Sequence, residues 1–339
     1  MSLKTIVYVS NADSREVLVY WMYPGSGDLS LVERVATSGV AMPMAVSPDR
    51  RYLYVGLRSE PYSVASFRID PDSGRLRAIA TTPLPDNFAY IATDRSGRFL
   101  LGASYAGNRI AINPIGPHGF VQAPPVQVMT TKPNAHAILV DPTNRFVFVP
   151  CLGGDAVLQL AFDAATGLVR SNDPPAVATR QGAGPRHFRF HPNNAFAYLM
   201  NELDGTLTTF AYDAGSGLLT ELQTLDSKPP GLADKPAGAD LHLTPDGRFL
   251  YGTIRGSSTI HAYAVEAKTG LLSPIGHWPA EEHPRGFQIC PRGRFLLCSG
   301  LHSHHLTMFR IDASSGALSV AKRYAAGRGP NWVEFVELP

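Results

Sequence analysis

The stretches Thr244-Pro-Asp-Gly-Arg-Phe-Leu-Tyr251 and Glu266-Ala-Lys-Thr-Gly-Leu271 carry the two signatures of a unit that recurs along this chain. The first is a polar turn that leads into an apolar strand. The second is a tight turn whose glycine accepts the positive φ that closes a hairpin. The glycines of the second signature are Gly27, Gly74, Gly119, Gly167, Gly217, Gly270 and Gly316. Their regular spacing of about 48 residues indicates an internal repeat.

Each repeat reads as strand, turn, strand, loop, strand, glycine turn and strand, and no segment has a long helical periodicity. Seven repeats of four short antiparallel strands predict an all-β protein, a seven-bladed β-propeller that forms a single domain over residues 1–339. The last blade lacks a complete first signature. Its innermost strand is expected over residues 330–336 and its partners over 5–10, 17–23 and 29–35, so strands from both chain ends would close the ring.

The composition narrows the possible partners and the compartment. The formal net charge is +2 and 17% of the residues are charged, which gives no reason to expect nucleic acid or an anionic membrane as partner. Cys151, Cys290 and Cys298 show no CxxC spacing, and their odd number argues against a disulfide framework. Residues 4–10 look like a β-strand and not like a signal peptide, and no apolar run reaches the ~18 residues of a membrane span. We therefore expect a soluble, cytoplasmic protein, either a monomer or a weak homodimer.

Propeller geometry predicts where a site would lie. The start of each innermost strand and the end of each second strand meet at the same mouth of the central channel. The starts of innermost strands supply Asn134, His136, Arg186, His187, Asp240, His242, Arg285, Asn331 and Trp332. The ends of second strands supply Asn11, Arg58, Tyr105, Asn201, Glu202, Arg255, His302, His304 and His305. Arginines and histidines around one opening, with a single glutamate, predict a pocket for a small anion.

Several non-repeating motifs at this mouth resemble those of a known family. They are Gly182-Ala-Gly-Pro-Arg-His-Phe-Arg-Phe-His-Pro192, Asn201-Glu-Leu203, Pro284-Arg-Gly-Phe287, Ser303-His-His305 and Gly329-Pro-Asn-Trp332. One of the repeated turns, Val46-Ser-Pro-Asp-Arg-Arg-Tyr-Leu-Tyr-Val-Gly56, resembles the same family. From residue 6 to residue 335 the chain is similar to the lactonase-type seven-bladed β-propellers, which include fungal enzymes that form or open muconolactones. The resemblance is strongest to the bacterial branch. It implies hydrolysis of 6-phospho-glucono-1,5-lactone to 6-phosphogluconate, a step of the pentose phosphate pathway, without a cofactor.

The resemblance also implies which residues carry the reaction. The family's active-site residues fall on His136, Arg186, Glu202 and Arg285. Glu202 or His136 is expected to act as general base, and the two arginines to hold the developing oxyanion or the phosphate. The residues expected to bind the substrate are His187, Arg58, Arg255, Asn201 and His305. Relatives usually carry Asn or Asp before the arginine at position 255, whereas this chain has Ile254.

Other interpretations stay open at this point. Glu202 could form a structural ion pair with an arginine, and Arg186 and Arg285 could bond carbonyls of neighbouring blades. The three histidines within residues 302–305 cannot all face one ion, so no metal site is expected. Gly102-Ala-Ser-Tyr-Ala106 lacks the second glycine of a nucleophile elbow. A cycloisomerase of a dicarboxylate lactone and a non-catalytic binding propeller are the competing functions.

Overall fold

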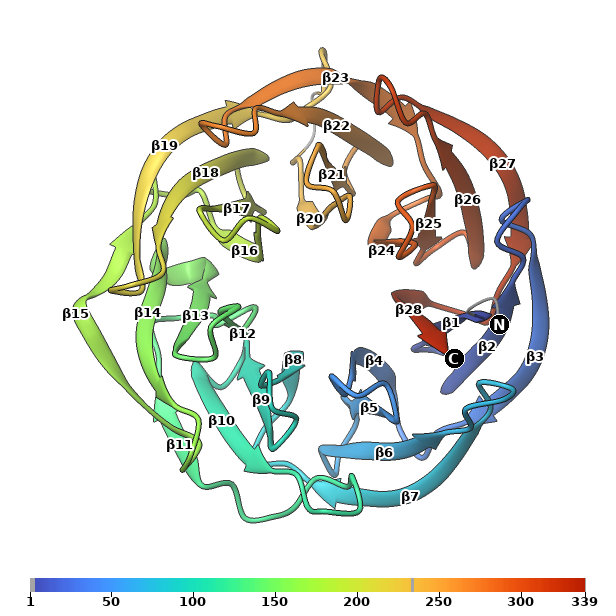
Figure 1. The fold of residues 1–339 in the computed structure, drawn as a ribbon, viewed down its shortest axis with the longest axis vertical. Helices are drawn as coiled ribbons and strands as arrows, with labels where there is room; N and C mark the ends of the chain where they lie inside the picture. Colours follow the sequence, from blue (N-terminus) through green and yellow to red (C-terminus); the bar gives the residue numbers. More distant parts are fainter. Residues whose placement is uncertain (1–3, 233–234, 339) are drawn as a thin grey trace.

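Seven sheets, each of four antiparallel strands, make up this computed structural model, which describes residues 4–232 and 235–338. Figure 1 shows the sheets arranged as blades around a central axis, with β4, β8, β16, β20, β24 and β28 nearest the centre. The predicted seven-bladed β-propeller is therefore confirmed. Within the described residues, no helix is long and apolar enough to span a membrane.

The first six blades each use four consecutive strands, from the innermost to the outermost. Blades 1 and 2 contain β4 (Ala41–Val46), β5 (Tyr52–Leu57), β6 (Ser63–Ile69), β7 (Leu76–Pro83), β8 (Phe88–Thr93), β9 (Phe99–Ser104), β10 (Arg109–Pro114) and β11 (Gln127–Thr130). Blades 3 and 4 contain β12 (Leu139–Val140), β13 (Phe146–Cys151), the short 3₁₀ helix η1 (Leu152–Gly154), β14 (Ala156–Asp163), β15 (Leu168–Ala178), β16 (Pro185–Phe190), β17 (Phe196–Asn201), β18 (Thr206–Asp213) and β19 (Leu218–Asp226). Blades 5 and 6 contain β20 (Gly238–Leu243), β21 (Phe249–Ile254), β22 (Thr259–Val265), β23 (Leu272–Pro279), β24 (Pro284–Ile289), β25 (Phe295–Gly300), β26 (His305–Ile311) and β27 (Leu318–Ala325).

The seventh blade joins the two ends of the chain, as the sequence predicted. Its innermost strand is β28 (Pro330–Leu338), followed by β1 (Lys4–Asn11), β2 (Glu16–Met22) and β3 (Leu29–Ala36). The antiparallel pairing of β1 with β28 runs from Lys4 opposite Leu338 to Asn11 opposite Pro330. The N- and C-terminal strands therefore share one ladder and close the ring.

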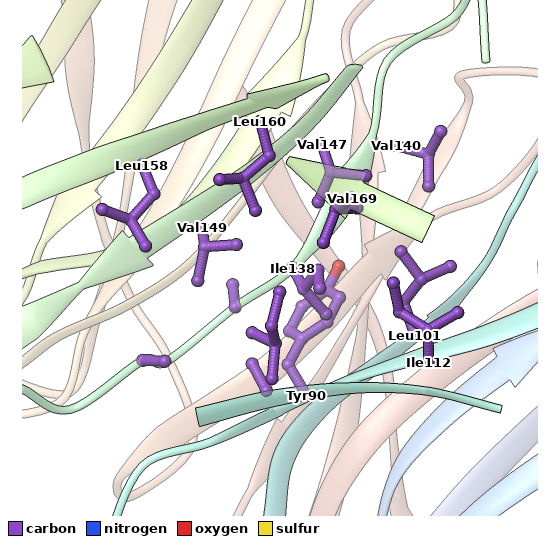
Figure 2. Close-up of a cluster of buried hydrophobic side chains, with 14 of the residues drawn as sticks. Tyr90, Leu101, Ile112, Ile138, Val140, Val147, Val149, Leu158, Leu160 and Val169 are labelled. Carbon is purple, nitrogen blue, oxygen red and sulfur yellow. The ribbon is translucent and has the colours of Figure 1, made fainter. Parts of the chain in front are cut away.

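The hydrophobic core lies between neighbouring blades and not within any one of them. Each of the seven buried clusters draws its side chains from two adjacent sheets. Figure 2 shows the cluster between blades 2 and 3, where Tyr90 and Leu101 meet Ile138, Val147 and Leu160. Because both faces of a blade are covered, the second strands are buried almost without interruption, as in β9 and β13.

The repeated glycine turns fasten each blade to the one before it. All seven predicted turn glycines have φ between 71° and 80°. At Gly270, between β22 and β23, the carbonyl accepts a hydrogen bond from the Tyr198 hydroxyl of the preceding blade over 3.0 Å. A Cβ at this position would overlap the ring of Phe196. The turn therefore requires glycine both for its backbone conformation and for its close approach to the preceding blade.

Candidate functional site

A β-bulge near the start of the innermost strands leaves single residues unpaired beside the channel. In β16 the register shifts between Pro185 and His187, so Arg186 has no partner across the sheet. Equivalent shifts leave unpaired Ala89 in β8, Arg285 in β24 and Asn331 in β28. Bulges often re-aim side chains next to active sites. The arginines of the Gly-Pro-Arg-His and Pro-Arg-Gly-Phe motifs owe their position to this irregularity.

The ends of the second strands form the rest of the wall. The residue directly after β5, β9, β17 and β21 is, in turn, Arg58, Tyr105, Glu202 and Arg255. A cavity of about 190 Å³, here called the outer cavity, is lined by Arg58, Ala89, Tyr105, His136, Glu202, Arg255 and Arg285. The structure thus brings together at one mouth five of the residues that the sequence suggested, namely Arg58, His136, Glu202, Arg255 and Arg285.

A second and much smaller space, here called the inner cavity, adjoins the first. Its volume is about 10 Å³, and it shares Ala89 and Arg285 with the outer cavity. The remaining lining residues are Met42, Pro43, Arg186, His187, Asn331 and Trp332. Arg186 and His187 therefore lie at the site, but they face the inner cavity and not the larger space.

Glu202 lies at the centre of the charges around the outer cavity. Its Oε2 is 2.8 Å from Nε of Arg186, and its Oε1 is 2.9 Å from Nη2 of Arg255. Burial alone would raise the pKa of Glu202, but Arg186 and Arg255 outweigh it and hold the pKa below the usual value. Arg255 also donates from Nε to the carbonyl of Ala237 over 3.0 Å. The bonds to Glu202 and Ala237 therefore fix its orientation, although residue 254 is the apolar Ile254.

Two other arginines of the outer cavity have no acidic partner among the described residues. Nε of Arg58 donates to the amide oxygen of Asn87 over 2.5 Å, and Arg285 lies among cations. Burial, followed by the charges of Arg186, Arg255 and Arg58, lowers the pKa of Arg285 well below its ordinary value. Glu202 can balance only one of the four positive charges. The site therefore carries an excess of positive charge that an anion can neutralise.

His136 completes the wall of the outer cavity. The side chain is 5% exposed, its Nε2 lies 3.9 Å from Oε2 of Glu202, and its Nδ1 has no partner among the described residues. Burial and then the neighbouring Arg186 lower the pKa of His136 well below its ordinary value. The ring is therefore neutral at pH 7.

Two predicted site residues do not line either cavity. Asn201 points its Nδ2 at the hydroxyls of Thr206 and Thr208, over 2.9 and 3.1 Å, and is 1% exposed. His305 donates Nδ1–H to the carbonyl of Ser303 over 2.6 Å. Tyr105, which the sequence placed at the same mouth without a role, lines the outer cavity. Within the part of the chain that the structure describes, no three His, Cys, Asp or Glu side chains are grouped to hold a metal ion.

Comparison with known proteins finds similarity along nearly the whole chain. Residues 5–335 match the family model described as lactonase, 7-bladed beta-propeller. The chain is 40% identical to a 6-phosphogluconolactonase of Pectobacterium carotovorum over 99% of this chain and 100% of that protein. It is 41% identical to a 6-phosphogluconolactonase of Serratia proteamaculans over 98% and 99%. Among solved structures, the periplasmic gluconolactonase PpgL of Pseudomonas aeruginosa superposes with a TM-score of 0.93, at 30% identity and with full coverage of both chains.

Proposed function

The chain belongs to the lactonase family of seven-bladed β-propellers, and we propose that it hydrolyses 6-phospho-glucono-1,5-lactone to 6-phosphogluconate. The names of the two bacterial relatives support this substrate, because each aligns with nearly the whole chain. The motifs that carry the arginines and Glu202 support it as well. No cofactor enters the proposed reaction, since hydrolysis needs only water, a proton acceptor and stabilisation of an oxyanion.

The observation that carries the proposal is the uncompensated charge of the outer cavity. Arg186 and Arg255 share the carboxylate of Glu202, whereas Arg58 and Arg285 have no acidic partner among the described residues. A phosphate dianion matches that excess, and guanidinium groups bind phosphate through paired, charge-assisted hydrogen bonds. We assign the phosphate to Arg58 and Arg285, and the lactone ring to the side of the cavity near His136 and Glu202.

Glu202 serves the reaction chiefly by holding two guanidinium groups in place. Its contacts with Arg186 and Arg255 make it a weaker base than a free carboxylate, because the same charges that keep it ionised also lower its affinity for a proton. Arg186, which lies against Glu202, is the donor available for the oxyanion that forms at the lactone carbonyl. Proton transfer then falls to a histidine of the site.

A second substrate is favoured by one specific comparison. The structural relative from Pseudomonas aeruginosa is named a gluconolactonase, without a phosphate. An enzyme for the unphosphorylated lactone would have no use for the excess charge at Arg58 and Arg285. Direct assays on both lactones, each corrected for spontaneous ring opening, separate the two substrates. Preference for the phosphorylated lactone supports the proposal, and equal or better turnover of glucono-1,5-lactone contradicts it.

The compartment follows from the substrate. A phosphorylated sugar is retained in the cytoplasm, and the three free, buried cysteines are compatible with reducing conditions. We therefore propose a cytoplasmic enzyme that acts on a small phosphorylated lactone as a monomer or a weak homodimer. Cell fractionation and light scattering on the purified chain test these two points.

A further inference from the structure

A buried histidine–carboxylate pair lies beneath the outer cavity, on the innermost strands β16 and β20. His187 donates Nδ1–H to Oδ1 of Asp240 over 2.8 Å, and the two residues are 2% and 5% exposed. The other oxygen of Asp240 lies 3.1 Å from Nε2 of His242. The backbone amide of Leu241 also donates to Oδ1 over 2.9 Å. Several groups thus hold the carboxylate, and the carboxylate in turn fixes the tautomer of His187.

This tautomer leaves Nε2 of His187 as a hydrogen-bond acceptor. The atom is buried and has no partner among the described residues. Burial, followed by the charge of Arg186, lowers the pKa of His187 to about 3, against the opposing effect of Asp240. The ring is therefore neutral at pH 7. A buried acceptor without a partner is unfavourable and calls for a group that can donate to it.

The inner cavity can supply that group. His187 lines it together with Arg186 and Arg285, and its volume of about 10 Å³ is close to the smallest space that admits one water molecule. The two cavities meet at Ala89 and Arg285. A water molecule here would donate to Nε2 of His187 and lie next to the space assigned to the substrate.

We propose that His187, oriented by Asp240, is the catalytic residue that takes the proton from a water molecule in the inner cavity and returns it to the leaving oxygen. The proposal rests on the lactonase function. As the water oxygen bonds to the carbonyl carbon, its O–H bond breaks, the proton moves to Nε2, and the carbonyl π electrons move to the oxygen beside the arginines. When the intermediate collapses, the bond from the carbonyl carbon to the ring oxygen breaks, and Nε2 protonates the departing alkoxide.

The geometry favours His187 over the two residues that the sequence suggested as base. Both oxygens of Glu202 already face guanidinium groups, Oε2 that of Arg186 and Oε1 that of Arg255, so neither is well placed to accept the proton of a water molecule. His136 has no carboxylate within hydrogen-bond distance, since Glu202 is 3.9 Å away. Protonation of His187 beside Arg186 is costly in the free protein. An anionic substrate offsets the arginine charges, so the cost falls once the substrate is bound.

The test compares single variants of the full chain on 6-phospho-glucono-1,5-lactone. His187→Gln is expected to lower kcat by about 100-fold or more and to leave KM within a few-fold, because the group acts on the transferred proton. Asp240 is a positioning residue, and Asp240→Asn is expected to lower kcat at least ~10-fold. Added imidazole should restore part of the activity of His187→Gly. The matched control is His261→Gln, since His261 is 0% exposed but lines neither cavity, and its kcat should stay within about twofold.

A kcat of His187→Gln within about threefold of the wild-type value, or a loss that His261→Gln shares, would overturn the proposal. Nitrogen NMR of the wild-type ring gives a readout that does not depend on turnover. Nδ1 should carry the proton and Nε2 none at pH 7, and Asp240→Asn should disturb that state, whereas a wild-type ring protonated at Nε2 contradicts the proposal. An inactive wild type overturns the proposed function and this role together, whereas an active wild type with an active His187→Gln overturns the role alone.

Discussion

Glu202 joins two arginines from different blades, which makes it the residue most sensitive to a small chemical change. In Glu202→Gln both Arg186 and Arg255 lose their counter-charge, so the group that faces the oxyanion shifts or turns away. We expect kcat to fall by roughly 100-fold with a smaller effect on KM. Steady-state kinetics check this, with Asp204→Asn as control, because Asp204 pairs with the exposed Arg180 in the same turn. Wild-type kcat in Glu202→Gln would show that the ion pairs are not needed for turnover.

Arg58 and Arg285 should distinguish the phosphorylated from the unphosphorylated lactone. Arg58→Met and Arg285→Met each remove a cation without an acidic partner among the described residues, so KM for 6-phospho-glucono-1,5-lactone should rise at least ~10-fold. Turnover of glucono-1,5-lactone should change little in Arg58→Met. Arg109→Met serves as control, since Arg109 pairs with Asp86 and neither residue lines either cavity. Equal losses on both lactones would move the phosphate site elsewhere, with Arg255 the next candidate.

The sequence predicted the position of single residues along the channel better than the direction of their side chains. Arg58, Glu202 and Arg255 lie where the repeat places the ends of second strands. Asn201 comes one residue earlier, and because side chains alternate along a strand it turns to Thr206 and Thr208 instead. The sequence carried no signal for the bond between His187 and Asp240, which joins two strands 53 residues apart.

At the scale of single elements, the glycine turns are the contacts most easily tested. Gly270→Ala adds a methyl group against Phe196 and forces an L-residue into a φ of 71°, so we expect a loss of about 2–4 kcal/mol in the free energy of unfolding. Gly182→Ala is the matched control, since its φ is 76° but nothing lies within 4 Å of the added carbon. Denaturant unfolding should show the smaller loss for Gly182→Ala. Equal losses would mean that backbone strain alone, and not packing between blades, requires glycine.

Strand β1 closes the ring through its pairing with β28. Removal of residues 1–10 should expose the edges of β28 and β2, and unpaired edges promote association between chains. We expect the shortened chain to aggregate or to accumulate as insoluble protein, measured by size-exclusion chromatography beside the full chain. A shortened chain that stays monomeric and keeps its melting temperature would contradict closure by β1.

The repeat predicted the blades because their turns depend on local chemistry. The irregular innermost strands were not predicted, because they depend on pairing with partner strands. The predicted strand around His136 is an example. Regular pairing of the innermost strand of blade 3 is limited to Leu139 and Val140, while Asn134 adopts a φ of 59°. The bulges at Arg186 and Arg285 were likewise not predicted, since register is set by partner strands and by the core, which a single sequence does not display. These irregular segments carry the site.

For the molecule as a whole, we propose that residues 1–339 unfold as a single unit. Each core cluster is shared by two blades, and the terminal strands share one sheet, so no blade can leave without exposing the cores of its neighbours. Far-UV circular dichroism and tryptophan fluorescence should therefore give coincident denaturation curves. Two separate transitions would contradict the proposal of one domain.

Buried neutral histidines should make the fold sensitive to acid. Burial lowers the pKa of His261 to about 3, and it lowers the pKa of His242 as well. In the unfolded chain, histidine takes up protons below about pH 6.5, whereas the buried histidines stay neutral. Their contribution to the free energy of unfolding is therefore fully present above that pH and is lost as the pH falls toward 3. Glu334 acts in the opposite sense, because burial raises its pKa to about 7 and acid therefore favours its folded form. It is one group against the two histidines, so the loss of stability in acid prevails. The melting temperature should fall between pH 7 and pH 5, and by less in His261→Gln. An identical fall in that variant would contradict the assignment.

We propose that a phosphorylated sugar lactone is hydrolysed at the mouth of this propeller. The most direct test measures ring opening of 6-phospho-glucono-1,5-lactone by the purified full chain, with the spontaneous rate subtracted, beside glucono-1,5-lactone under the same conditions. We expect saturable acceleration, with kcat/KM at least ~10-fold higher for the phosphorylated lactone, because Arg58 and Arg285 gain a partner only there. Ring opening of the phosphorylated lactone at no more than its spontaneous rate would rule out the proposed function.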